Sequence, residues 1–182
     1  MNKNLAIKVC QLSVENRLML ILGVTIANDL SASSHVNRIL SACSGSLHAL
    51  RVLRAHGLPP TALHEVARAT TISRLLYASP AWWGFTTASD RLKLQRFLQR
   101  AKRLGYLPPQ QQDLDRMMEE ADVKLLLAVN RNSQHVLRGL FPPTVCRPYA
   151  LRPRPHEYEL PKKDDHNFIS RVLYRTIRDV KF

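Results

Sequence analysis

The side chains in this sequence that can do chemistry are mostly cationic, and four of them recur along one predicted helix over residues 87–105. They follow one another at steps of three, four and three residues: Lys93, Arg96, Arg100 and Arg103. This spacing places them in one stripe, opposite the apolar face of the helix. The helix contains one acidic residue, Asp90, so pairing within it cannot neutralise the stripe. A solvated helix face is the ordinary outcome for such charges, but their excess favours contacts with the phosphates of a nucleic acid.

Two further arginine pairs extend the predicted nucleic-acid-binding set. Arg51 and Arg54 lie one helical step apart on an earlier predicted helix. There they can either clamp a phosphate or lie along the surface with their charged ends in water. Arg152 and Arg154 lie in a proline-rich stretch that is expected to be extended, and they are candidates for RNA contacts. The candidate site therefore combines residues from three separate segments of the chain.

Patterns typical of catalytic or metal sites are not found in the sequence. The cysteines, Cys10, Cys43 and Cys146, are far apart, and no CxxC pair or Cys/His quartet occurs. This argues against a zinc site and against a disulfide scaffold. The adjacent carboxylates Asp164 and Asp165 follow two lysines and are interpreted as part of a solvated loop or a helix cap. We assign no catalytic residue, no metal ligand and no cofactor to this chain.

The overall charge narrows the class of partner. The 182 residues include 27 Lys and Arg against 14 Asp and Glu, a net charge of +13. This excess favours a polyanion, first a nucleic acid and second an anionic membrane surface. No apolar run approaches the roughly 20 residues that span a bilayer, and the N-terminus lacks the order of a signal peptide. The expected location is intracellular, in the nucleus or cytoplasm, and the oligomeric state stays open.

The elements that must position these residues are predicted to be mainly helical, after a small N-terminal β-hairpin. Gly57 follows the helix predicted over 33–56, and Gly105 ends the helix predicted over 87–105. The expected N-terminal caps of the first three helices are Ser33 or Ser34, Thr61, and Thr87 or Ser89. The predicted strands cover 4–12 and 16–27, the helices cover 33–56, 61–79, 87–105, one or two segments of 111–138, and 166–178, and an extended strap with six prolines covers 142–161.

Two local features are open to a structural or a functional interpretation. Trp82 and Trp83 follow a helix break and are interpreted as core side chains that fix a turn, with base stacking as the alternative. Arg74 lies in line with apolar residues, and an arginine in that position needs a partner. We expect a buried ion pair with Glu65 or Asp90, and contact with a nucleic acid is the alternative.

Four motifs occur together in a fixed order along nearly the whole chain. They are LGV at 22–24 followed by HV at 35–36, SRLLYASPAWWG at 73–84, SDR at 89–91 leading to RAKR at 100–103, and YALR at 149–152 with LP at 160–161 and NFISR at 167–171. In this order and spacing they resemble the region after the palm in reverse transcriptases of non-LTR (LINE-type) retrotransposons. The Jockey-like kind is the nearest.

The resemblance implies a domain organisation and an activity. Residues 1–29 correspond to the end of the palm, 30–105 to the thumb, and 106–182 to the C-terminal extension. The implied fold is mainly α: a helical thumb-like bundle with a small N-terminal β-hairpin and a proline-rich strap before a short C-terminal helix. In this family the thumb packs on the template–primer duplex, so the implied partner is nucleic acid, RNA or DNA. The family activity is RNA-directed DNA synthesis with Mg²⁺.

The chain departs from the family at the polymerase active site. Polymerase chemistry needs two metal ions about 4 Å apart on carboxylates, which the family supplies in part from an aromatic-x-Asp-Asp motif, and this sequence contains no such motif. The family's endonuclease domain and Cys/His cluster are not found either. We therefore expect a fragment, from a truncated or mis-started reading frame, that binds nucleic acid without polymerase activity. The alternatives are a free-standing basic helical RNA/DNA-binding module and a degenerate transposon product without function.

Overall fold

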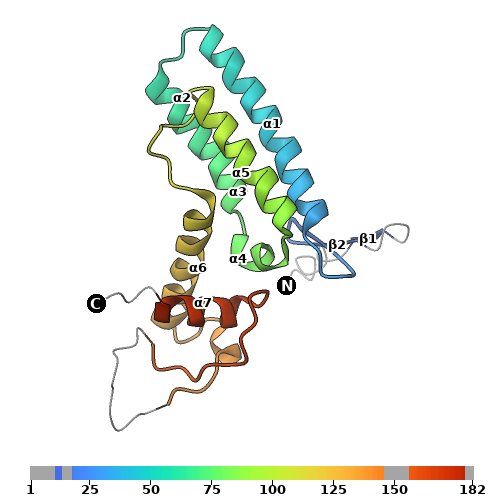
Figure 1. Cartoon of the computed structure of the whole chain (residues 1–182), viewed down its shortest axis with the longest axis vertical. Coiled ribbons are helices and arrows are strands. Elements are labelled where there is room, and N and C mark those ends of the chain that lie inside the picture. The colour runs from blue at the N-terminus through green and yellow to red at the C-terminus, as the bar shows by residue number, and fades with distance from the viewer. Residues whose placement is uncertain (1–10, 14–17, 146–155, 179–182) are drawn as a thin grey trace, which may run out of the picture. The chain divides into compact units, whose positions relative to one another are not determined.

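The computed structural model describes residues 11–13, 18–145 and 156–178, and it is mainly helical with a small antiparallel sheet near the N-terminus (Figure 1). This confirms the predicted fold class. The elements are β1 (Gln11–Ser13), β2 (Leu18–Ile21), β3 (Val24–Ala27), α1 (Ser33–Ala55), α2 (Pro60–Ala67), the π-helix η1 (Arg68–Ile72), α3 (Ser73–Leu76), α4 (Ser79–Trp82), the 3-10 turn η2 (Trp83–Phe85), α5 (Ala88–Arg103), α6 (Leu114–Arg131), the 3-10 turn η3 (Arg138–Leu140) and α7 (Phe168–Arg178). The chain divides into two compact units between Met117 and Met118.

The predicted strand over 16–27 is in fact a hairpin of two short strands. β2 pairs with β3 in antiparallel register, and β1 pairs with the other edge of β2. Leu22 and Gly23 form the turn, with φ of +45° and +87°. Positive φ at both central residues gives a two-residue turn whose twist matches that of the strands. The prediction of one strand over 16–27 is wrong, because Gly23 allows the chain to reverse direction within this segment.

The free edge of β3 is covered by the start of α1. The Thr25 backbone N–H donates to Nδ1 of His35 at 3.3 Å, and the Ala27 N–H donates to the Ser31 carbonyl at 3.0 Å. His35 is 2% exposed, and its ring packs in a T-shaped arrangement with the ring of Trp82, with centroids 5.2 Å apart. Burial, with a further contribution from the Arg38 charge, lowers the pKa of His35 from 6.5 to about 4. The imidazole is therefore neutral in the folded protein at neutral pH.

This buried histidine makes the stability of the first unit sensitive to mild acid. The unfolded chain takes up a proton near pH 6.5 and the folded chain near pH 4, so the stabilisation is present above pH 6.5 and is lost as pH falls between these values. We expect the free energy of unfolding to drop by about 2–3 kcal/mol between pH 7 and pH 4.5 from this group. Urea titrations across that range measure it.

His35→Gln is the control for this effect, because glutamine can still accept from the Thr25 N–H but does not titrate. The variant should show a shallower dependence of stability on pH over the same range. Parallel curves for the two proteins would exclude His35 as the group responsible.

Helix α1 confirms the predicted helix over 33–56, but its predicted serine cap is wrong. The N-cap is Ala32, with no side-chain cap bond. The Ser33 hydroxyl instead donates to the carboxylate of Asp90, 57 residues later, at 2.6 Å. Asp90 also accepts from the Thr87 backbone and hydroxyl in the capping box that starts α5, so the predicted Thr87 cap is confirmed. Burial alone raises the pKa of Asp90, but the Ser33 and Thr87 hydrogen bonds and the nearby Lys93 charge outweigh it and hold that pKa below its usual value.

The single helix predicted over 61–79 is divided into α2, η1 and α3. It starts at Pro60, whose fixed φ suits the first helical position, so the predicted Thr61 cap is wrong. The helix ends at Leu76, and Ala78 takes a φ of +49°. Trp82 then donates from Nε1 to the Tyr77 carbonyl at 3.0 Å. This bond closes the turn that ends the helix.

The aromatic and cationic side chains of this region have structural roles. Trp82 and Trp83 are 0% and 2% exposed, so they are core residues and the base-stacking alternative is wrong. Arg74 is exposed and donates to the Ala42 carbonyl at 3.2 Å and to the Ser46 hydroxyl at 3.1 Å. The expected buried pair with an acidic residue is therefore wrong. Because Arg74 is exposed, its guanidinium does not need an acidic partner.

The second unit is built around the end of α6, and α7 confirms the helix predicted over 166–178. Its apolar cluster contains Leu126, Val172 and Leu173, with Phe141, Tyr158, Leu160, Phe168 and Ile169 packed against them. Arg171 and Asp122 form a buried ion pair in the same unit, with Nε to Oδ2 at 2.8 Å. Two residues of the predicted strap, Thr144 and Tyr158, form an antiparallel bridge. Residues 146–155 of the strap lie outside the described residues.

Candidate nucleic-acid interface

Two helix ends come together in the first unit to form the candidate site. Helices α1 and α5 lie side by side and run in the same direction, so their C-termini are at the same end of the bundle (Figure 1). Each helix is followed by a glycine with positive φ, Gly57 at +86° and Gly105 at +73°. Cations near a helix C-terminus are stabilised by the helix dipole, by about 0.3–1 kcal/mol each. The helix dipole therefore favours arginine at both C-termini. The packing of α1 against α5 brings these two groups of arginines close together.

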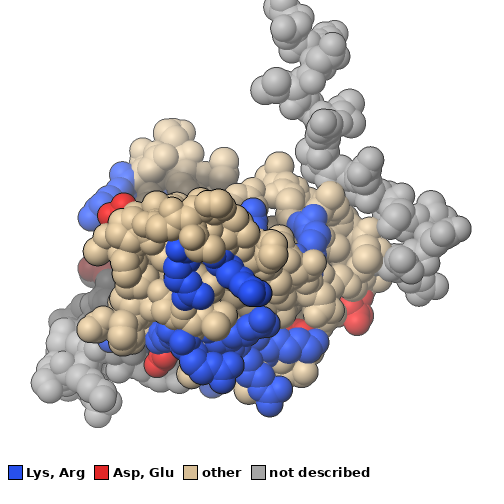
Figure 2. Space-filling view, turned by 90° about the horizontal axis from the view of Figure 1, so that it is seen from above, with Lys and Arg blue, Asp and Glu red and all other residues tan. Residues whose placement is uncertain are grey.

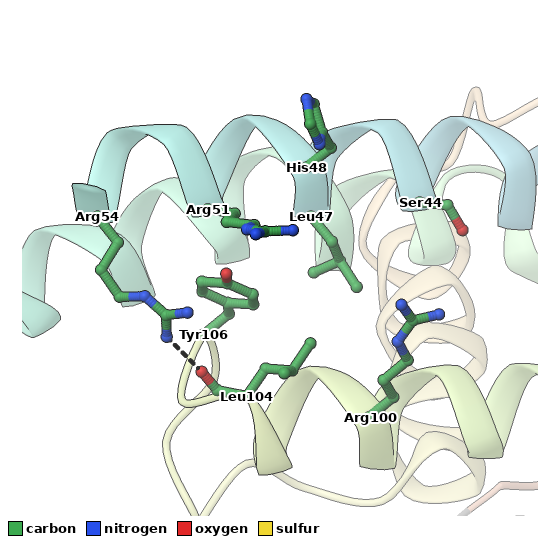
Figure 3. Close-up of a pocket in the computed structure, with 8 residues that line it drawn as sticks. All are labelled: Ser44, Leu47, His48, Arg51, Arg54, Arg100, Leu104 and Tyr106. Carbon is green, nitrogen blue, oxygen red and sulfur yellow. Dashed lines mark hydrogen bonds between the residues drawn. The ribbon is translucent and has the colours of Figure 1, made fainter. Parts of the chain in front are cut away.

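A hollow of about 300 Å³ lies between these helix ends, and we call it the arginine recess (Figure 3). Arg51 and Arg54 come from α1, and Arg100 comes from α5 on the opposite side. Tyr106 and Leu47 are 2% and 7% exposed and form its apolar base. The full lining is Ser44, Leu47, His48, Arg51, Arg54, Arg100, Leu104 and Tyr106. Three cations therefore surround an apolar base, with no acidic side chain in the lining.

One guanidinium of the recess is held in place by two contacts. Arg54 donates from Nη1 to the Leu104 carbonyl at 2.8 Å, and its Cζ lies 4.7 Å from the centroid of the Tyr106 ring. The last carbonyls of a helix have no partner within the helix, and His64 Nε2 lies 3.3 Å from the next one, that of Gly105. These contacts join the end of α5 to α1 and α2. They also fix the Arg54 side chain before any ligand binds.

A second hollow of about 540 Å³, which we call the arginine groove, adjoins the first. Its lining is Leu92, Gln95, Arg96, Gln99, Arg100 and Arg103. Arg100 lines both hollows, so the recess and the groove are joined. Arg51, Arg96, Arg100 and Arg103 are exposed, and within the described residues none of them has a hydrogen bond or ion pair through its side chain. Their guanidinium groups are therefore available to a ligand.

The acidic side chains near the two hollows form ion pairs or hydrogen bonds with other side chains. The Asp90 carboxylate lies 3.5 Å from Lys93 Nζ, and Asp113 lies 3.9 Å from Lys102 Nζ. Asp115 accepts from Gln95 Nε2 at 3.3 Å and is the acidic group nearest the groove by these contacts. Figure 2, which views this end of the helices from above, shows Lys and Arg side chains gathered near the middle of the face. Lys and Arg predominate among the charged side chains there.

The structure groups five of the eight predicted site residues: Arg51, Arg54, Arg96, Arg100 and Arg103. Lys93, from the same predicted stripe, lines neither hollow and lies beside Asp90. Arg152 and Arg154 lie outside the described residues.

Five residues of the recess are not among the predicted site residues: Ser44, Leu47, His48, Leu104 and Tyr106. Leu104 is apolar but 37% exposed, and its carbonyl accepts from Arg54. Gly105 was the available signal, because a helix-ending glycine with positive φ turns the chain back and lets Tyr106 pack beneath Arg54.

Two kinds of feature are not seen in the described part of the chain. Residues 11–13, 18–145 and 156–178 bring together no group of three or more His, Cys, Asp or Glu side chains that could hold a metal ion. None of the helices in those ranges combines the length and apolar character needed to cross a membrane. Searches of protein-family models, curated proteins and solved structures found no match to this chain.

Proposed function

We propose that this chain is the C-terminal part of a non-LTR retrotransposon reverse transcriptase and that it grips template–primer nucleic acid by the backbone. The observation that carries the binding role is the set of five arginines on two helices, around two joined hollows whose lining contains no acidic side chain. The motifs at 22–24, 73–84, 89–103 and 149–171 support the family. The proposed surface lies on the segment that corresponds to the thumb.

The chemistry of this surface suits phosphates more than bases. Guanidinium groups bind phosphate oxygens through paired, charge-assisted hydrogen bonds. Each neutralised phosphate releases condensed counterions, so affinity depends strongly on salt and little on sequence. The tryptophans that might have stacked on bases are buried in the core. We therefore expect binding of a duplex through its backbone.

Fluorescence anisotropy with a labelled RNA–DNA duplex tests the binding role. With about five phosphate contacts, affinity should fall on the order of 10²–10³-fold between 50 and 200 mM salt. Duplexes of different sequence should bind alike. The proposal fails if the protein does not bind at 50 mM salt, or if affinity follows the base sequence.

Polymerase activity is expected to be zero for the 182-residue chain alone. The chain contains no aromatic-x-Asp-Asp motif to hold two metal ions beside a primer end. Primer extension with Mg²⁺ and nucleotides, beside an active reverse transcriptase as positive control, should yield no elongated product. Extension by the purified protein would disprove this expectation.

The family assignment has its own test, separate from the binding measurements. In the genomic DNA upstream of the codon for Met1, an aromatic-x-Asp-Asp motif, in frame or frameshifted, would support the retrotransposon origin. Its absence there would favour a free-standing basic module.

A further inference from the structure

We infer that the arginine recess binds the phosphate monoester at the end of a nucleic-acid strand, while the arginine groove holds phosphodiesters further along the same strand. This inference rests on the proposed nucleic-acid binding. It assigns different ligands to two hollows that are each lined by three arginines but differ in how those arginines are arranged.

The shape of the recess suits a phosphate at the end of a strand. Arg51 and Arg54 lie on one side and Arg100 on the other, and Tyr106 and Leu47 close the base (Figure 3). The groove, in contrast, is lined almost wholly by exposed faces of one helix, α5. A strand can run along a single helix face, whereas a hollow with opposed walls and a base favours a compact terminal group.

The charge of the recess matches a monoester better than a diester. Its lining offers three guanidinium groups, and none of the lining residues is acidic. A phosphate monoester carries about −1.5 to −2 charge at pH 7 and three strong acceptor oxygens. A backbone phosphodiester carries a single negative charge. Three converging cations therefore interact more strongly with the monoester at the end of a strand than with a diester in its interior.

Preorganisation strengthens the recess as a specific site. Arg54 is already held by the Leu104 carbonyl and the Tyr106 ring, so little side-chain freedom is lost when it binds. In Figure 3 the Tyr106 hydroxyl points toward Arg51, which places another donor at the same hollow. The guanidinium groups of Arg51 and Arg100 have no protein partner within the described residues, so both can bind the phosphate.

The groove supplies the path for the rest of the strand. Arg100 lines both hollows, and Arg96 and Arg103 lie on either side of it along α5. Arg96 and Arg103 are seven residues apart, which is about 10 Å along a helix. This row of cations favours a polymer of phosphates over an isolated phosphate or a single lipid headgroup.

Matched oligonucleotides test the inference directly. One strand of an RNA–DNA duplex is prepared with a 5′-phosphate, with a 3′-phosphate, or with hydroxyls at both ends, each form carrying an internal fluorophore. We expect one phosphorylated form to bind roughly tenfold more tightly than the hydroxyl form at low salt. The form that gains identifies which end is bound. Equal affinity of all three would overturn the inference while leaving the proposed function intact, and no binding by any would overturn both.

Two variants separate the recess from the groove. Arg51→Gln should remove most of the preference for the phosphorylated end. Arg103→Gln, a matched control, should weaken all the oligonucleotides by a similar factor and keep the preference. Both residues are exposed, and thermal melting checks that both variants fold. If Arg51→Gln keeps the preference, or Arg103→Gln alone abolishes it, the recess is not the site.

The headgroup of a phosphoinositide also carries a phosphate monoester, so binding to lipid is tested in parallel. Vesicles of neutral phospholipid with or without a phosphoinositide monophosphate are sedimented with the protein. We expect no cosedimentation that depends both on the phosphoinositide and on Arg51. Such cosedimentation, without a preference among the oligonucleotides, would assign the recess to a membrane headgroup and overturn the inference.

Discussion

The combined variant Arg51→Gln, Arg96→Gln, Arg100→Gln and Arg103→Gln should bind a nucleic-acid duplex roughly 100-fold more weakly than the parent protein at low salt. Each arginine that contacts a phosphate contributes about 0.9 to the slope of log affinity against log salt on B-form DNA. The slope should therefore fall by about 3 to 4. Anisotropy titrations at four or more salt concentrations measure both quantities.

The loss should come from the position of these charges rather than from net charge alone. The control variant replaces four exposed cations of the second unit: Lys124, Arg131, Lys162 and Lys163, each by glutamine. Both variants lose four positive charges, so long-range attraction to a polyanion is reduced equally. A control that weakens binding as much as the first variant would remove the two hollows from consideration. Arg54 is left unchanged because its bond to Leu104 supports the end of α5.

Arg171→Leu should destabilise the second unit by about 3–5 kcal/mol. Arg171 binds Asp122 through two parallel contacts, Nε to Oδ2 at 2.8 Å and Nη2 to Oδ1 at 3.1 Å. The side chains are 4% and 2% exposed, so water cannot replace the lost partner. Arg175, whose Nη1 lies 3.9 Å from Asp122, compensates in part. Urea unfolding measured by circular dichroism gives the change in free energy.

A double variant distinguishes loss of the ion pair from loss of packing. Replacing Asp122 and Arg171 together by leucine removes both charges, and the cost should be well below the sum of the two single changes. Arg131→Leu, on an exposed position of α6, should change stability by less than about 0.5 kcal/mol. Additive costs for the two single changes would show that the ions do not depend on each other.

Segments with one apolar face were predicted well because their pattern reflects the local geometry of a helix. Helices α1, α5 and α7 lie close to the predicted ranges, since apolar residues at three- and four-residue steps form one buried face. Two of the errors fell where a distant residue competes. Ser33 does not cap α1 because Asp90, far along the chain, takes its hydroxyl. Arg74 binds the backbone of α1 rather than an acid, which its own segment does not indicate.

The amino-acid sequence by itself determined the mainly helical class, the excess of positive charge, and the row of cations along α5, because each depends on residue type and local spacing. Only the tertiary structure decided which cations act together. The parallel packing of α1 and α5 places Arg51 and Arg54 opposite Arg100, while Lys93 of the same row lies beside Asp90. The physical reason is that a helix repeats its faces every few residues, whereas the meeting of two helix ends depends on contacts between residues about 50 positions apart, such as Arg54 with Leu104.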